Sequence, residues 1–239
     1  MNRPLGPIVT DWRPAIRPEN LNLSGHWAQV DLLDAEGDAH GLWEAFAGHD
    51  WVWDYLFENP PQDFATFRNI MRANAGRDGQ PCYVIRAKDD PKPLGYACYW
   101  TVVPAMGSNE IGNVNLSPAL QQTPIATDAF FLMIDWAFAN GYRRMEWKCN
   151  ALNLPSRKAA ERLGFSFEGV FRNHTIVKGL NRDTAWFAIT DDDWPALRDA
   201  YQTWLSPDNF DADGNQRISL SRLTRPHLFQ RDPTLSQTT

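Results

Sequence analysis

The sequence predicts an α/β domain built on a mixed, largely antiparallel sheet that is flanked by helices. Three strand-like runs of apolar residues follow one another between residues 82 and 116. Helical patterns precede this group, and a helix, a strand, a second helix and a β-hairpin follow it. The chain has 239 residues, of which 43% are hydrophobic, so a sizeable core is expected.

The first part of the chain is predicted to contain one strand and two helices. Residues 1–25 are rich in proline and asparagine, which favours an irregular N-terminal arm laid on the domain. Residues 26–33 alternate as a first strand. Residues 38–48 carry apolar side chains at helical spacing, with Asp38 as the expected N-cap. Residues 62–75 form a second helix with one apolar face.

The central part is predicted to be a strand meander followed by a buried helix. Strands are expected over residues 82–87, 94–103 and 109–116. The helix over residues 124–140 is apolar nearly all round, so it should be buried on most sides. It ends before Gly141, because glycine is the residue most typical just after a helix end.

A strand–helix unit and a hairpin complete the predicted domain, which is expected to span residues 26–205. The elements are a strand over 144–150, a helix over 154–163 capped by Asn153, hairpin strands over 165–177 and 184–189, and a helix over 191–205. The remaining residues, 206–239, are polar with scattered prolines, which favours an extended or partly disordered C-terminal tail.

Composition argues against several classes of protein. The net charge of −6 disfavours a broad nucleic-acid surface, which needs a basic face. No run of 18 apolar residues predicts a membrane span, and the N-terminus has no apolar signal region. Three widely spaced cysteines predict no disulfide framework and favour the reducing cytoplasm. No paired Cys or His spacing indicates a metal site.

The stretch LSPALQQTPIATDAF, residues 116–130, joins the last meander strand to the long helix. Strand, short polar loop and helix is an arrangement that presents free backbone N–H groups to an anion. The loop contains no glycine, although phosphate-binding loops usually do, so a plain connection is the alternative.

Four segments together resemble the GNAT N-acyltransferase superfamily and, within it, the RimJ/RimL-type branch. They are EIGNVNLSP at 110–118, ATDA at 126–129, GYRRMEWK at 141–148 leading into the N-x-x-S-x-x-x-x-E-x-x-G-F pattern from Asn153 to Phe165, and WDYL…P at 53–60. The resemblance covers roughly residues 27–190. It implies a GNAT-type sheet with a V-shaped splay between two central strands, acetyl-CoA as cofactor, and acetyl transfer to an amine.

The resemblance also implies a cofactor site. The superfamily turn reads Q/R-x-x-G-x-G/A and binds the CoA pyrophosphate, but Pro124 stands here at the middle glycine. Proline removes one N–H donor, yet it suits the first turn of a helix with Thr123 as N-cap. Backbone around residues 113–116 would bind the thioester. The implied cofactor-binding residues are Asn115, Leu116, Gln121, Gln122, Thr123, Ile125, Ala126, Thr127, Asn153 and Ser156, with the amides of 122, 123, 125 and 126 as phosphate donors.

Three residues are candidates for the chemistry that the resemblance implies. Glu110 is the first candidate for the general base, with a solvated strand end as the alternative. Glu146 is the second, although the favoured interpretation is a structural ion pair with Lys148. Ser156 is the candidate acid that reaches the sulfur, because Ala160 stands where many members carry a tyrosine. Protonation of the thiolate by water, or without help from the enzyme, is the alternative.

By the same resemblance, an aromatic segment walls the acceptor pocket. Trp51, Trp53 and Tyr55, which alternate with Phe57, are the predicted contacts, and the alternative is that some of them seal the core. His174 would border the acceptor side, or else be a hydrogen-bonded structural residue. The acceptor is expected to be a primary amine on a small molecule, an amino-acid derivative or a protein N-terminus, and the protein a monomer or homodimer.

Two functions follow from these patterns. One is an active acetyl-CoA-dependent N-acetyltransferase, favoured by Asn153, Ser156 and the carboxylate of Glu110. The other is a catalytically silent GNAT-fold domain that binds a nucleotide or a protein partner, favoured by Pro124 and Ala160. Transfer of a longer acyl group is a third possibility, which pocket-lining residues would decide.

Overall fold

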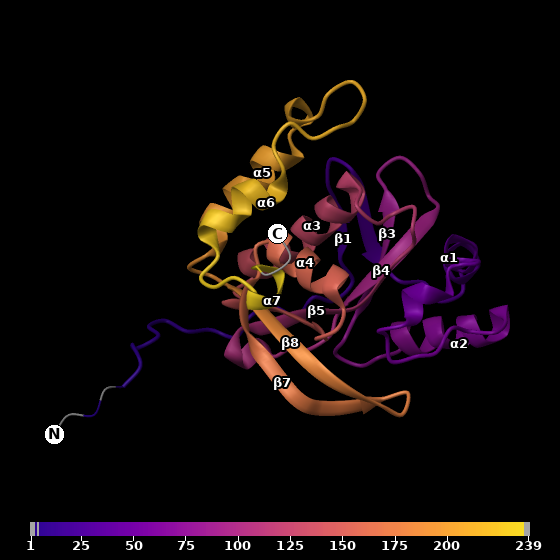
Figure 1. The fold of residues 1–239 in the computed structure, drawn as a ribbon, viewed down its shortest axis with the longest axis horizontal. Helices are drawn as coiled ribbons and strands as arrows, with labels where there is room; N and C mark the ends of the chain where they lie inside the picture. Colours follow the sequence, from indigo (N-terminus) through magenta and orange to yellow (C-terminus); the bar gives the residue numbers. More distant parts are fainter. Residues whose placement is uncertain (1–2, 4, 237–239) are drawn as a thin grey trace.

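Eight strands form one open sheet in the computed structural model, which describes residue 3 and residues 5–236 (Figure 1). Their order is β1-β2-β3-β4-β5-β6-β8-β7, and every neighbouring pair is antiparallel except β5 and β6. The bounds are β1 Asn22–Ser24, β2 Ala28–Leu32, β3 Cys82–Ala87, β4 Pro93–Tyr99, β5 Ser108–Leu116, β6 Arg144–Asn150, β7 Ser166–Val177 and β8 Leu180–Thr190. The predicted fold class is confirmed.

Helices cover both faces of the sheet (Figure 1). One core cluster lies beneath α1, α2 and η1, and the other lies beneath α3, α4 and α5. The helical bounds are α1 Ala39–Phe46, η1 Asp50–Trp53, α2 Phe64–Ala75, η2 Pro104–Met106, α3 Pro124–Ala139, α4 Leu154–Arg162, α5 Trp194–Leu205, η3 Pro207–Asn209, α6 Leu220–Thr224, η4 Arg225–His227 and α7 Pro233–Ser236.

The parallel strands β5 and β6 separate at the centre of the sheet. They are in register only from Ser108 opposite Arg144 to Glu110 opposite Glu146. Beyond that point β5 stays paired with β4, and β6 stays paired with β8. A register shift in the β4–β5 pair coincides with Asn113, whose left-handed φ of 47° marks a β-bulge. The predicted V-shaped splay therefore opens directly after the two glutamates.

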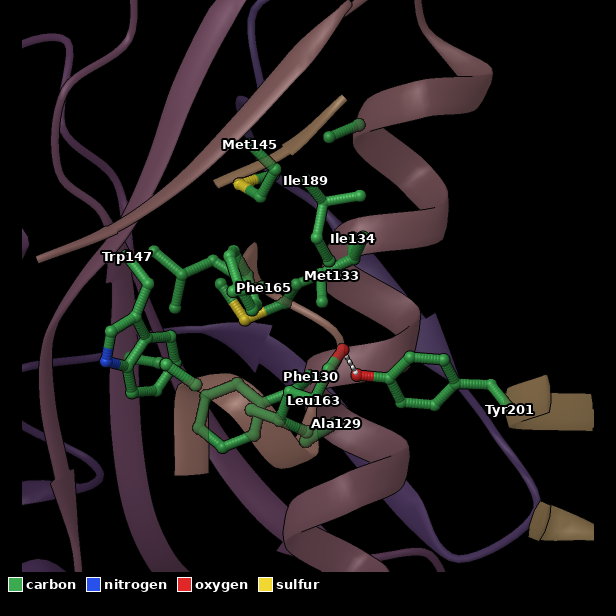
Figure 2. Close-up of a cluster of buried hydrophobic side chains, with 14 of the residues drawn as sticks. Ala129, Phe130, Met133, Ile134, Met145, Trp147, Leu163, Phe165, Ile189 and Tyr201 are labelled. Carbon is green, nitrogen blue, oxygen red and sulfur yellow. Dashed lines mark hydrogen bonds between the residues drawn. The ribbon is translucent and has the colours of Figure 1, made fainter. Parts of the chain in front are cut away.

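The larger core cluster anchors the two helices that border this splay. Figure 2 shows Trp147 of β6 in the same buried cluster as Phe130 of α3 and Phe165, which follows α4. The ring centroids of Trp147 lie 5.4 Å from Phe130 and 5.7 Å from Phe165. The Tyr201 hydroxyl of α5 donates to the Leu163 carbonyl at 2.8 Å. Each of these large buried side chains contributes about 1.5–3 kcal/mol, so β6 is rigidly positioned.

Most of the predicted element bounds are confirmed, and the hairpin shows where the pattern misleads. The turn between β7 and β8 contains only Lys178 and Gly179, not the predicted five residues. Both have positive φ, 52° and 76°, as a two-residue hairpin turn requires. Polar residues at 181–183 belong to β8 near the hairpin tip, where strand pairing does not need apolar side chains.

The prediction of an irregular N-terminal arm is wrong for its last residues, because β1 pairs with β2 and belongs to the sheet. The Tyr83 hydroxyl donates to the Pro18 carbonyl, and the Trp12 indole donates to Ala105 O at 3.0 Å. These contacts fasten residues 12–25 to the domain. Residues 5–11 are exposed and run away from the body of the molecule (Figure 1).

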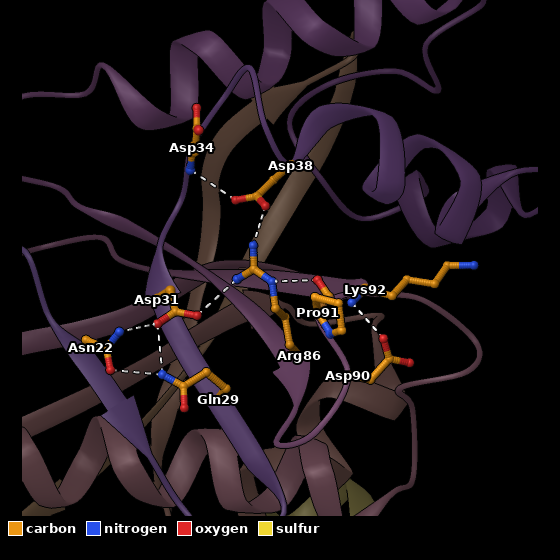
Figure 3. Close-up of polar contacts among 9 residues, drawn as sticks. All are labelled: Asn22, Gln29, Asp31, Asp34, Asp38, Arg86, Asp90, Pro91 and Lys92. Carbon is orange, nitrogen blue, oxygen red and sulfur yellow. Dashed lines mark hydrogen bonds and ion pairs between the residues drawn. The ribbon is translucent and has the colours of Figure 1, made fainter.

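Asp38 does not cap α1 with its side chain, contrary to the sequence pattern. Its carboxylate accepts from the Asp34 amide at 3.0 Å and pairs with Arg86 of β3, which also pairs with Asp31 at 3.1 Å (Figure 3). The Asp38 carboxylate thus pairs with Arg86 of a nearby strand and does not accept a hydrogen bond from the first backbone amides of α1.

The C-terminal segment is not extended or disordered within the described residues. Residues 220–224 and 233–236 form the short helices α6 and α7, and α6 packs against α5 and α4. Arg157 of α4 donates from Nε and Nη2 to the two carboxylate oxygens of Asp232, both at 2.6 Å. Polar composition misled here because a buried ion pair, together with a few apolar side chains such as Leu220, fastens the segment.

Cys82 and Cys98 form a disulfide, so the expectation of no disulfide is wrong. They lie 16 residues apart in sequence but directly opposite each other in the β3–β4 pair. Cys149 is free and buried. The cytoplasmic location stays a prediction.

A thiol titration checks this cysteine assignment. Burial raises the pKa of the Cys149 thiol to about 11, so the native protein is expected not to react with iodoacetamide at neutral pH. In denaturant without reductant, one thiol per chain should react, and after reduction all three should react. Three reactive thiols in denaturant before reduction would show that Cys82 and Cys98 are not joined.

Candidate functional site

The point of the splay holds a cluster of charged side chains. Glu110 of β5 is 4% exposed, and its Oε2 accepts from Lys148 Nζ at 2.9 Å and Thr101 Oγ1 at 2.6 Å. Lys148 of β6 also pairs with Glu146 at 2.7 Å. Glu110 Oε1 has no hydrogen-bond donor among the described residues and lies beside Gly112, where a Cβ would come within 3.1 Å of it. One oxygen of Glu110 is fixed and the other is free to accept a proton.

The charges in this cluster are set by mutual pairing. Burial opposes ionisation of Glu146, but hydrogen bonds from Lys148 and Arg144 outweigh it and hold its pKa below the usual range. Burial likewise opposes the charge on Lys148, but attraction to Glu110 and Glu146 outweighs it and raises the Lys148 pKa. The structural pair of Glu146 and Lys148 is confirmed. Glu146 is a weak candidate base because two cations stabilise its carboxylate.

The turn before α3 resembles an anion site in its backbone. Thr123 Oγ1 accepts from the Ala126 amide at 3.2 Å, which confirms Thr123 as N-cap. The Ala126 amide is therefore not available, contrary to the sequence expectation. The amides of Gln122, Thr123 and Ile125 have no partner in the part of the chain that the structure describes. Three donors at the positive end of a 16-residue helix remain for a phosphate group.

Side chains around this turn support the backbone. Gln121 Nε2 donates to the Leu116 carbonyl at 2.9 Å and so ties the turn to the end of β5. Thr127 is buried, and its hydroxyl accepts from Arg162 Nη1 at 3.1 Å, which joins α3 to α4. The Asn115 side chain is buried opposite Tyr96 on β4, so cofactor binding by Asn115 would fall to its backbone.

Replacing Thr123 by alanine tests the cap. The variant is expected to lose about 0.5–2 kcal/mol of unfolding free energy because the Ala126 amide loses its acceptor. Urea unfolding followed by circular dichroism measures this. Thr123→Ser should stay near the parent, because it keeps the hydroxyl, and an equal loss in both variants would contradict the cap.

Asn153 and Ser156 lie on the other side of the splay. Asn153 Oδ1 accepts from the Ser156 amide at 3.1 Å, so the predicted helix cap is confirmed. The Ser156 hydroxyl accepts from Trp147 Nε1 at 3.0 Å. The same hydroxyl also hydrogen-bonds the buried Cys149 thiol, so it would have to leave that contact to donate its proton to a leaving thiolate.

The predicted acceptor residues lie in different environments. Trp53 is 2% exposed within the core beneath α1 and α2, so its predicted role as a substrate contact is wrong. Trp51 is 52% exposed. The Tyr55 hydroxyl donates a hydrogen bond of 3.4 Å to the carbonyl of Leu152, which lies just before α4. His174 hydrogen-bonds Thr184 through Nδ1 at 2.9 Å and contacts the Trp186 ring at 6.1 Å.

Lys178 links the tip of the β7–β8 hairpin to η1, because its Nζ donates to the Trp53 carbonyl at 2.7 Å.

Five residues near the splay were missed by sequence reasoning. They are Arg77, Trp100, Thr101, Arg182 and Trp186. Spacing along one strand or helix could not reveal them, since they come from three separate parts of the chain.

No group of three or more His, Cys, Asp or Glu side chains in the described residues could hold a metal ion. Within the same residues, no helix has the length and hydrophobicity of a membrane span.

Comparisons with known proteins agree with this geometry. The acetyltransferase (GNAT) domain model matches residues 32–166. A GCN5-related N-acetyltransferase from Brucella melitensis is 38% identical, with a TM-score of 0.88 over 91% of this chain and 100% of its own. A probable GNAT-family acetyltransferase from Chromobacterium violaceum is also 38% identical, with a TM-score of 0.78 over 82% and 99%. No curated protein matches the sequence.

More distant structures share the fold alone. The ribosomal L7/L12 α-N-protein acetyltransferase RimL is 20% identical, with a TM-score of 0.60 over 70% of this chain and 91% of its own. The microcin C7 self-immunity acetyltransferase, solved with acetyl-CoA and AMP, is 18% identical, with the same TM-score over 70% and 93%.

Proposed function

The chain belongs to the GNAT acetyltransferase family, and we propose that it transfers the acetyl group of acetyl-CoA directly to a primary amine held against Glu110. The observation that carries this proposal is the position of Glu110 at the point of the splay. One carboxylate oxygen is fixed by Lys148 and Thr101 while the other has no donor among the described residues. A positioned, partly unpaired carboxylate is what a general base requires.

The residues around the splay fit the cofactor. The open amides of Gln122, Thr123 and Ile125 suit the pyrophosphate, and Asn153 and Ser156 flank the path of the pantetheine arm. Acetyl-CoA supplies an activated thioester, whose carbonyl would lie along residues 113–116 of β5. The bulge at Asn113 turns this backbone out of the sheet pairing, which frees polar groups to hold the developing oxyanion.

Three proton movements complete the reaction. Glu110 Oε1 takes a proton from the ammonium group, which makes the nitrogen nucleophilic, and passes it to solvent. It takes the second nitrogen proton once the C–N bond has formed and the C–S bond breaks. Ser156 Oγ, oriented by the Trp147 indole, gives its proton to the leaving sulfur and regains one from solvent. Cys149 takes no part, because burial raises its pKa to about 11 and keeps it a neutral thiol.

The branch of the family, the acceptor class, the cellular location and the oligomeric state are proposed from the sequence. The RimJ/RimL-type branch is supported by the N-x-x-S pattern at Asn153 and Ser156. The acceptor classes that this branch implies are small amines, amino-acid derivatives and protein N-termini. We propose a cytoplasmic protein that acts as a monomer or homodimer.

An acceptor screen tests the function. A panel of small amines and peptides would be incubated with acetyl-CoA, and CoA release would be followed by a thiol reagent. Acetylation of at least one amine, with product identified by mass spectrometry, is the expected result. Acetyl-CoA binding without any amine-dependent CoA release would instead support a silent domain that binds a nucleotide or a protein partner.

A further inference from the structure

The acceptor side of the splay carries a row of stacked cationic and aromatic groups, Arg77, Trp100, Phe57 and Arg182, here called the basic–aromatic row. The Arg77 guanidinium lies 4.3 Å from the Trp100 ring centroid, and the Arg182 guanidinium lies 4.8 Å from that of Phe57. Phe57 and Trp100 are nearly parallel, at 10°, with centroids 6.4 Å apart. Phe57 precedes α2 and Arg77 follows it. Trp100 directly follows β4, and Arg182 belongs to β8.

The row adjoins the catalytic carboxylate. The Trp100 amide donates to the Glu110 carbonyl at 2.8 Å, and Trp100 Cβ and Glu110 Oε1 both border Gly112. Burial lowers the pKa of Arg182, although Glu110 lies near enough to oppose the shift. Arg182 shares its β8 face with Trp186, whose ring lies 4.3 Å from Lys148 Nζ.

Neither guanidinium of the row has an anionic partner. Within the described residues, Arg77 and Arg182 form no ion pair, and the Nε atom of each is buried without a hydrogen-bond acceptor. Other charges near the splay are paired, as Lys148 and Arg144 are with glutamates. A partly buried guanidinium with unpaired donors lacks the charge-assisted hydrogen bonds that such groups normally make. An acceptor oxyanion would supply them.

We propose that the acceptor is an amine that also carries an oxyanion, a carboxylate or a phosphate, bound on the basic–aromatic row with Arg182 as its main ligand. This inference rests on the proposed function. The amine then lies against Glu110 while the oxyanion lies against the row, so the two ends of a zwitterionic acceptor meet opposite charges. The flat faces of Trp100 and Phe57 favour an acceptor with a planar group between these ends.

Binding of three related probes to the CoA-saturated protein tests the inference. Tyramine carries the amine alone, 4-(2-aminoethyl)benzoate adds a carboxylate across the ring from the amine, and tyramine O-phosphate adds a phosphate in the same direction. Calorimetry should show at least one acidic probe binding about tenfold or more tighter than tyramine. The probe that binds tighter distinguishes a carboxylate from a phosphate source.

Variants locate the binding group. Arg182→Gln is expected to abolish the preference for the acidic probe, and Arg77→Gln to reduce it, with acetyl-CoA affinity unchanged. Arg68→Gln is the matched control, because Arg68 also stacks on an aromatic ring, Phe64 at 5.8 Å, and has a buried unpaired Nε. It lies outside the row and should leave the preference intact.

Three results would overturn the inference: equal affinity for all three probes, no binding of any probe at millimolar concentration, or a preference that survives Arg182→Gln. None of these results touches the proposed function while acetyl-CoA still binds and some amine is still acetylated. Loss of the proposed function would appear separately, as failure of acetyl-CoA to bind or as the absence of acetylation of every amine in the screen.

Discussion

Glu110→Gln is expected to lower kcat/KM for the amine by about a hundred- to ten-thousand-fold, because glutamine cannot accept the ammonium proton. Glutamine keeps the shape of glutamate and a carbonyl oxygen for Lys148 and Thr101, so the fold and acetyl-CoA binding should persist. Steady-state kinetics by CoA release, with calorimetry of acetyl-CoA in parallel, measures both effects.

Glu146→Gln is the matched control for this experiment. Glu146 sits opposite Glu110 in the same strand pair, but it is paired with both Arg144 and Lys148. Its loss is expected to change kcat/KM by less than about tenfold, since no proton transfer depends on it. Equal losses in the two variants would show that the charge cluster acts structurally and that Glu110 is not the base.

Arg157→Leu is expected to lower the unfolding free energy by about 3–5 kcal/mol, because it leaves the Asp232 carboxylate buried without its cation. Asp232 is 0% exposed and receives two hydrogen bonds from Arg157. For a chain of this size the melting temperature should fall by about 6–20 °C. Differential scanning calorimetry measures the shift.

Two further variants interpret this loss. Arg198→Leu removes the same side chain from an exposed pair with Asp135, and it should cost no more than about 1 kcal/mol. Arg157→Leu combined with Asp232→Leu should recover part of the lost stability, because no charge is then left buried. If the double variant is no more stable than Arg157→Leu, the ion pair is not what fastens the C-terminal segment to α4.

Local patterns predicted the fold well where the cause of an element lies within it. Strands β3 and β6 have the predicted bounds, and α3 begins at Pro124 because Thr123 caps it. The mixed, mostly antiparallel sheet followed from the sequence of elements, and its central splay from the resemblance. The failures involve partners far apart in the chain, such as Arg157 with Asp232, or Cys82 with Cys98 across a hairpin.

The candidate site was predicted only in part, for the same reason. Glu110, Asn153 and Ser156 could be named from motifs in single segments. The ammonium that fixes Glu110 comes from β6, and its position depends on a register that the sequence does not state. Trp53 was misassigned because alternation along 51–57 cannot tell which aromatic ring faces the core. The basic–aromatic row joins four separate segments and left no local signal.

Calorimetric titration of acetyl-CoA and CoA into the purified protein tests the central claim most directly, with Gln121→Ala as the companion variant. Gln121 ties the phosphate turn to the Leu116 carbonyl, so its loss should loosen the turn without touching Glu110. Micromolar binding of acetyl-CoA that is weakened several-fold in the variant is the predicted result. Absence of binding at millimolar acetyl-CoA would contradict a cofactor site in the splay, and with it the proposed acetyl transfer.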